Sequence, residues 1–191
     1  MIKRFSAIGY KSLAGSPVEL RPLTVLLGPN AVGKSNFLDA IQLLARMVSS
    51  RTLKEAFDPP YRGTPLESFS FGPEGIPGHM EKETLQLTFE VDVELSPQTV
   101  RAVDKLVVEM RKKRDDEETE SKPRQAVKEK LLRYRLGVEI LPRSGILRVI
   151  DESLAALKSN GEPKVSRNPF LEKKDQRLSL RLEGQAHPMF H

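Results

Sequence analysis

The stretch that decides the fold class runs from residue 23 to residue 35 and reads LTVLLGPNAVGKS in this chain of 191 residues. Its second part, Gly28 to Ser35, matches G-x-x-x-x-G-K-[ST], the Walker A pattern of the phosphate-binding loop in nucleotide triphosphatases. Glycine at positions 28 and 33 lets the backbone turn and approach a ligand closely. Successive amide groups can then point at phosphate oxygens. We therefore expect a nucleotide-binding site here.

The motif also predicts how the phosphates would be held. A helix that starts near Lys34 directs the positive end of its dipole at the same place. Lys34 supplies a cation for the β- and γ-phosphates, as the catalytic residue, and the Ser35 hydroxyl can ligate Mg²⁺. The predicted binding residues are Gly28, Pro29, Asn30, Ala31, Val32, Gly33, Lys34 and Ser35. The alternative is a glycine turn that happens to precede Lys-Ser.

The flanks of the motif favour nucleotide binding over that alternative. Residues 23–27 form a continuous apolar run, which is typical of a strand buried on both faces in a parallel sheet. A helix is expected over residues 34–48. Its main apolar stripe, at helical spacing, is Phe37, Leu38, Ile41, Leu44, Ala45 and Val48. Ala40, Leu43 and Met47 widen this stripe, so we expect the helix to pack on more than one side.

Beyond the helix the pattern changes. Residues 49–82 are rich in proline and glycine and predict a loop. Later segments alternate apolar and polar residues, which indicates half-buried strands of an antiparallel sheet. The expected strands are 1–8, 17–20, 85–95, 132–140, 146–150 and 178–182, in addition to the run at 23–27. The predicted fold class is α/β with an incomplete parallel core, divided into a phosphate-loop lobe over 1–95, a charged helical insertion over 96–130 and an antiparallel continuation over 131–191.

Composition narrows the possible functions. The chain has no cysteine, which excludes disulfides, thiolate metal sites and cysteine nucleophiles. No apolar run approaches the roughly 20 residues that span a bilayer, and a cytoplasmic location fits. The net charge is +5, and residues 101–135 carry most of the excess. The run Arg111 to Arg114 permits contact with DNA, but acidic residues follow at once, so a solvated charged helix is the competing interpretation.

The N-terminal sequence resembles the RecF/OLD/SMC-like group of ABC-type P-loop ATPases, of the AAA family. The resemblance rests on IKRFSAIGYKSL at 2–13, LTVLLGPN at 23–30 and GKSNFLDAI at 33–41. It implies that residues 30–35 wrap the triphosphate of ATP with Mg²⁺, that Asn36 packs at the helix start within the binding site, and that Lys11 and Ser12 approach the nucleotide. It further implies ATP-driven dimerisation of two ATPase heads, linked to DNA repair, chromosome maintenance or phage defence.

Parts of the hydrolytic machinery of that group are missing from the sequence. We find no LSGGQ-like signature segment. The best match to a Walker B strand is residues 146–152, ending in Asp151 and Glu152, but Arg148 interrupts it. A strand that runs into a helix capped by Asp151 is the favoured interpretation. His79, His187 and His191 are expected to face solvent.

These gaps suggest that the chain is the N-terminal portion of a longer ATPase, able to bind ATP without hydrolysing it efficiently. Two other functions stay open on the sequence alone. One is a small-molecule or nucleoside kinase with the same loop. The other is a non-hydrolysing nucleotide-binding module.

Overall fold

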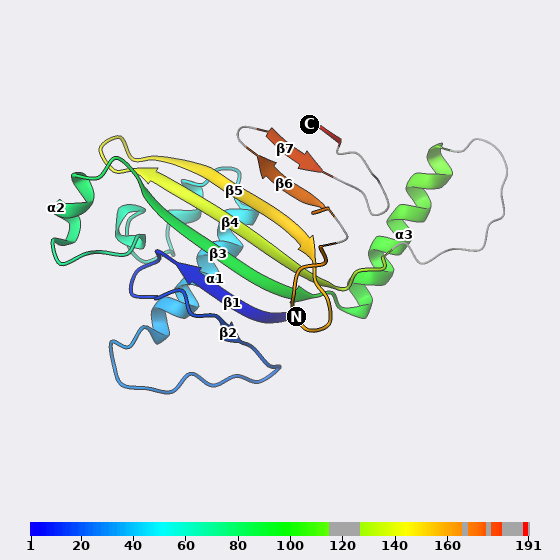
Figure 1. The fold of residues 1–191 in the computed structure, drawn as a ribbon, viewed down its shortest axis with the longest axis horizontal. Coiled ribbons are helices and arrows are strands. Elements are labelled where there is room, and N and C mark those ends of the chain that lie inside the picture. Colours follow the sequence, from blue (N-terminus) through cyan, green and yellow to red (C-terminus); the bar gives the residue numbers. More distant parts are fainter. Residues whose placement is uncertain (115–126, 166–167, 175–176, 181–188, 191) are drawn as a thin grey trace.

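One antiparallel sheet organises the protein in the computed structural model (Figure 1), which describes residues 1–114, 127–165, 168–174, 177–180 and 189–190. The eight strands lie in the order β2-β1-β3-β4-β5-β6-β7-β8, and each neighbouring pair is antiparallel. The strands are β1 (Ile2–Ile8), β2 (Val18–Glu19), β3 (Leu85–Glu94), β4 (Leu131–Leu141), β5 (Ile146–Ala156), β6 (Leu171–Lys174), β7 (Arg177–Leu180) and β8 (Met189–Phe190). The helices are α1 (Lys34–Ser49), α2 (Gly75–Met80) and α3 (Pro97–Arg114), with short 3₁₀ turns η1 (Glu55–Phe57) and η2 (Leu66–Ser68).

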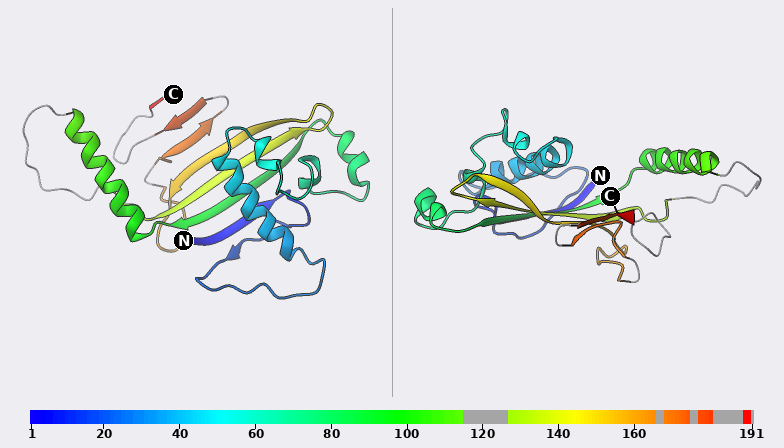
Figure 2. Two further views of the ribbon diagram at one scale, coloured as in Figure 1. Left: turned by 180° about the vertical axis from the view of Figure 1, so that it is seen from behind. Right: turned by 90° about the horizontal axis from the view of Figure 1, so that it is seen from above.

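The core forms where α1 crosses one face of the sheet, as the views in Figure 2 show. The strand alternation seen in the sequence explains which face is buried: Leu87 and Phe89 of β3 point to the helix and are each 1% exposed. Their registered neighbours are Val138 and Leu136 of β4, which are also buried. Phe5 of β1 adds an aromatic contact, because its ring packs edge-on against Phe37 of α1 at 5.5 Å between centroids.

Most of the predicted antiparallel elements are confirmed. β1 lies inside the sheet, because β2 pairs with it on one side at Val18 and Glu19 and β3 pairs with it on the other. β5 continues through Ala156, so the helix expected after residue 150 does not form. Pairing with β4 along its whole length keeps this segment extended. Residues 181–182 of the strand expected at 178–182 lie outside the described residues.

Residues 23–27 are not the buried parallel strand that their apolar run predicted. The segment is irregular, and Leu23, Val25 and Leu27 are 83%, 67% and 86% exposed. A strand that is apolar on both faces needs neighbouring strands and covering layers on both sides. Among the described residues no strand pairs with it. The fold class is therefore α/β with an antiparallel sheet, without a described parallel strand.

The helix α1 packs against the sheet and, through Arg46, against η1, but part of its predicted main stripe is uncovered. Its buried residues are Phe37, Asp39, Ala40, Leu43, Leu44 and Met47. Leu38 and Val48, from the predicted main stripe, are 59% and 57% exposed. The helix therefore has a second apolar stripe that nothing covers within the described part of the chain.

The helical insertion begins as the sequence predicts. The Ser96 hydroxyl accepts a hydrogen bond from the Thr99 amide at 3.1 Å, and Pro97 starts α3. Such a cap satisfies an amide that the helix leaves unpaired. The backbone of Arg111–Arg114 ends this helix, while residues 115–126 and the side chains of 110–114 lie outside the described residues. None of the helices in the described ranges is long and apolar enough to cross a membrane.

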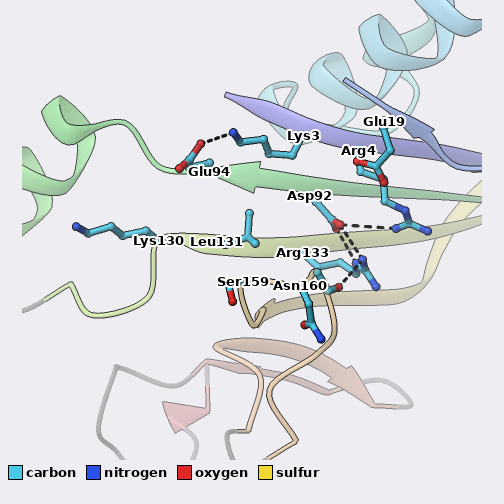
Figure 3. A pocket seen from close by; sticks show the side chains of 11 residues that line it. Lys3, Arg4, Glu19, Asp92, Glu94, Lys130, Leu131, Arg133, Ser159 and Asn160 are labelled. Carbon is cyan, nitrogen blue, oxygen red and sulfur yellow. Dashed lines mark hydrogen bonds and ion pairs between the residues drawn. The ribbon is translucent and has the colours of Figure 1, made fainter. Parts of the chain in front are cut away.

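The face of the sheet opposite α1 carries paired charges. Arg133 makes two hydrogen bonds to Asp92, at 2.6 and 2.7 Å, and Arg4 binds Glu90 at 2.6 Å. Arg4, Asp92 and Arg133 line a hollow of about 680 Å³, shown in Figure 3. Lys3, Arg4 and Arg133 of this hollow are already paired with carboxylates, so most of its positive charge is compensated.

The burial of Phe89 predicts its contribution to stability. We expect Phe89→Ala to lower the free energy of unfolding by about 3 to 5 kcal/mol, since it removes a buried ring and leaves a cavity. Urea unfolding followed by circular dichroism measures this loss. Val165→Ala, at a position 92% exposed, is the control and should change stability by less than about 0.5 kcal/mol. Equal effects of the two substitutions would contradict the core described above.

Candidate phosphate-binding site

The loop Gly28–Ser35 has a backbone that only a glycine-rich sequence adopts easily. Gly28 and Gly33 have φ angles of 149° and 99°, in the region that side chains disfavour. Ala31 also has a positive φ, 65°, which is uncommon for a residue other than glycine. Residues held in such conformations cluster at functional sites. The loop is exposed from residue 28 to residue 32 and therefore open to a ligand.

Lys34 lies over its own loop. Its Nζ donates hydrogen bonds to the carbonyl oxygens of Gly28 and Pro29, at 2.8 and 2.7 Å. No carboxylate in the described part of the chain forms an ion pair with it. A cation held only by neutral carbonyls, at the centre of a tight loop, is placed to exchange them for an anion.

The start of α1 adds further donors. Gly33 is the N-cap and has no side chain to bond the first amides, and the first turn contains no acidic residue. The unpaired amide groups of a first helical turn carry partial positive charge and favour anions. Ser35 is exposed in this turn. Loop, Lys34 and helix start together can surround a phosphate, so the residues present fit the phosphate groups of a nucleotide.

Ser12 contacts the last glycine of the loop from outside. A Cβ atom placed on Gly33 would meet Ser12 Oγ at 3.1 Å, so the space beside this glycine is already filled. The Ser12 hydroxyl also accepts a hydrogen bond from Asn36 Nδ2 at 2.8 Å. Asn36 therefore packs at the helix start, with its amide directed to Ser12.

The Lys11 ammonium group binds a carboxylate that the sequence patterns did not single out. Its Nζ binds Asp39 Oδ2 at 3.2 Å, and Arg62 binds Asp39 Oδ1 at 2.8 Å. Burial raises the pKa of Asp39, but hydrogen bonds from Arg62 and Lys11 outweigh that effect and hold it below its usual value. The signal in the sequence was an acidic residue inside the apolar pattern of the helix, where a buried charge needs partners.

A chain of hydroxyl groups lies beside this ion-pair cluster. Tyr10 Oη and Tyr61 Oη are 2.9 Å apart, and Tyr61 Oη lies 2.7 Å from Ser68 Oγ. Burial and the hydrogen bond with Tyr61 raise the pKa of Tyr10, so this phenol stays protonated at neutral pH. These residues fix the segment 58–70 against the turn that contains Lys11.

Other sequence candidates lie elsewhere in the fold. Asp151 and Glu152 lie within β5, where Asp151 binds Arg135 at 2.6 Å and Glu152 accepts a hydrogen bond from Tyr134 at 2.7 Å. Both carboxylates thus have partners in the sheet. The prediction that His79 faces solvent is wrong. Its side chain is 1% exposed, and its ring stacks on Phe71 with 4.9 Å between the ring centroids. His187 and His191 lie outside the described residues.

The lowered pKa of Asp39 predicts how its ion pairs depend on pH. The stabilisation is complete above the pKa of the unfolded chain, about 3.9 for an aspartate, and is lost as the pH falls through the lower folded value. We expect Asp39→Asn to be less stable than the unmodified chain at pH 7, with the difference beginning to shrink as the pH falls below about 4. Urea unfolding at pH 7, 5 and 3 measures it. A stability difference between the two chains that stays constant from pH 7 to pH 3 would contradict the lowered pKa of Asp39.

Comparison with known proteins agrees with this geometry. No curated protein matches the chain. One family of protein domains does match, over residues 23–137, and its description is "AAA domain, putative AbiEii toxin, Type IV TA system". The match begins at the apolar run before the loop and extends through α1 and β3 into β4. Because it spans more than half of the chain, this protein belongs to that AAA domain family and carries a nucleotide-binding, ATPase-like P-loop domain.

Proposed function

We propose that this chain is the ATP-binding portion of a RecF/OLD/SMC-like ATPase. The observation that carries the proposal is the Lys34 ammonium group, held by two carbonyls of its own loop at the start of α1. Phosphate oxygens would replace these carbonyls as partners of Lys34. Charge-assisted hydrogen bonds of this kind are stronger than those to neutral carbonyls.

The remaining loop residues have separate roles in this proposal. The amides of Ala31, Val32 and Gly33 would face the phosphates, and the exposed Ser35 hydroxyl would be the protein ligand of Mg²⁺. Mg²⁺ characteristically takes one or two protein ligands together with substrate phosphates and water, and it neutralises charge that develops during phosphoryl transfer. Asn36 would act from the edge of the site, through its hydrogen bond to Ser12.

Hydrolysis requires a group that orients water, and we propose that such a group comes from outside the described residues. In those residues no carboxylate hydrogen-bonds Lys34 or Ser35, and Asp151 and Glu152 have partners in the sheet. By this proposal the chain binds ATP without hydrolysing it efficiently. Joining of two ATPase heads by ATP would couple the nucleotide state to DNA repair, chromosome maintenance or phage defence.

The uncovered apolar surface supports an ATPase head that contains a parallel core in addition to the described residues. The exposed residues of 23–27 and the outer stripe of α1, Leu38 and Val48, are the surfaces that a parallel core would bury. Kinases of small molecules are less consistent with the chain, because the sheet after the loop is antiparallel throughout its described strands.

Removal of the Lys34 cation tests nucleotide binding directly. We expect Lys34→Ala to weaken binding of Mg-ATP at least tenfold, since it removes the only side-chain cation of the loop. Isothermal titration calorimetry with the full chain measures it. Lys105→Ala, on the exposed side of α3, is the matched control. Unchanged affinity in Lys34→Ala would show that the loop is not the site, and would leave only a structural role for the motif.

The mass of the protein in solution, measured with and without nucleotide, tests whether two ATPase heads dimerise. We expect the longest native form of the protein to sediment as a dimer with Mg-ATP and as a monomer with Mg-ADP, because the γ-phosphate would bridge the two heads. Analytical ultracentrifugation separates these states. A mass that is the same with ATP, with ADP and without nucleotide would contradict the RecF/OLD/SMC-like mechanism while leaving ATP binding intact.

A further inference from the structure

Lys11 has a left-handed backbone conformation that is unusual for a lysine. Its φ angle is 43°, in the left-handed region that residues other than glycine rarely adopt. Such a conformation persists where the surrounding structure determines it. Here the Lys11 amide donates to the Ser68 carbonyl at 3.0 Å, and Tyr10 pairs with Phe69 in an isolated β-bridge. The turn is therefore held from the side of the segment 58–70, which we call loop 58–70.

The Lys11 side chain is held from three directions. Its ammonium group lies 5.3 Å from the ring centroids of both Tyr10 and Tyr61, a distance typical of cation–π contacts. It also donates to Asp39 Oδ2 at 3.2 Å and to the Arg62 carbonyl at 3.5 Å. Lys11 therefore joins the N-terminal turn, α1 and loop 58–70 at one point.

Asp39 is the shared partner in this cluster. One carboxylate oxygen accepts from Lys11 and the other from Arg62, and the Asp39 side chain is only 11% exposed. Without its charge, the largely buried Lys11 ammonium group would lose its carboxylate partner, and the exposed Arg62 side chain would lose its link to the helix. Loop 58–70 and the N-terminal turn are thus held together through one carboxylate on the helix.

The same turn reaches the phosphate loop. Ser12 follows Lys11 directly, fills the space beside Gly33 and accepts the hydrogen bond from Asn36. Asp39 itself lies one helical turn after Ser35, on the same face of α1. Its carboxylate binds Lys11, the residue directly before Ser12. The Lys11–Asp39 pair is therefore connected to Gly33 and Asn36 through Ser12, and to the first turn of α1 through the helix itself.

We propose that Asp39 is a positioning residue that couples loop 58–70 to the phosphate loop, so that nucleotide binding at the phosphate loop orders loop 58–70. This inference rests on the proposed nucleotide-binding function. The coupling runs through packed and hydrogen-bonded side chains of the kind whose substitution changes coupling energies between sites. By reciprocity, whatever engages loop 58–70 also changes the affinity for nucleotide.

The test combines affinity with hydrogen–deuterium exchange, using Mg-ATPγS and the full chain. In the unmodified chain we expect nucleotide to slow exchange of amides in loop 58–70. Asp39→Asn should raise the Kd about tenfold and abolish that slowing, while Asp39→Glu, which restores the charge, recovers part of the affinity. Arg62→Met is a second variant that should fold normally, since its side chain is 70% exposed, and it should reduce the slowing and raise the Kd.

The control breaks an ion pair of similar length on the opposite face of the sheet. Arg4 binds Glu90 at 2.6 Å with both side chains about one-fifth exposed, so Arg4→Met should lower stability while leaving the Kd and the exchange pattern unchanged. The proposal is overturned if a folded Asp39→Asn or Arg62→Met binds Mg-ATPγS with unchanged Kd, or if nucleotide never slows exchange in loop 58–70.

Failure of this inference and failure of the proposed function have different signatures. If Lys34→Ala loses affinity while Asp39→Asn does not, only the coupling fails. If Lys34→Ala binds as tightly as the unmodified chain, or if the unmodified chain does not bind at all, the proposed function fails and the coupling fails with it. If Arg4→Met raises the Kd as much as Asp39→Asn, the effect is one of general stability and the coupling is rejected.

Discussion

The packing of α1 against the apolar face of β1, β3 and β4 is the interaction on which the rest of the structure depends. Phe5, Leu87 and Phe89 form a buried surface that only one stripe of the helix can match. Because α1 begins at Lys34, burial of this stripe also places the phosphate loop at the edge of the sheet. Hydrophobic burial is not itself directional, but here it positions a phosphate loop whose hydrogen-bond donors need a defined orientation.

Charge is distributed differently on the two faces of the sheet. On the face opposite α1, arginines and carboxylates compensate one another around the hollow of Figure 3. At the phosphate loop Lys34 has only neutral partners. Concave shape alone would favour the hollow as the binding site, yet an anionic ligand gains most where a cation and helix amides lack an anion. Electrostatics therefore favours the small loop over the larger hollow.

The ion-pair cluster around Asp39 adds a tertiary layer to the loop. A buried carboxylate is costly unless it is paired, and here the partners come from residues far apart in the sequence, Lys11 and Arg62. That requirement explains why a strained backbone at Lys11 and an irregular segment at 58–70 persist beside a regular helix. The strained backbone at Lys11 holds the ammonium group that compensates the buried carboxylate of Asp39.

Sequence patterns by themselves determined the local features of this protein. Glycine spacing with Lys34 and Ser35 predicted the phosphate loop, and strict alternation predicted β3 and β4, because these depend on backbone sterics and on the period of a strand. Only the tertiary structure decided what distant residues do. It left 23–27 exposed, since an apolar run becomes a strand only where neighbours pair with it. It also brought Lys11 and Arg62 to Asp39, since a buried charge takes whichever partners folding places beside it.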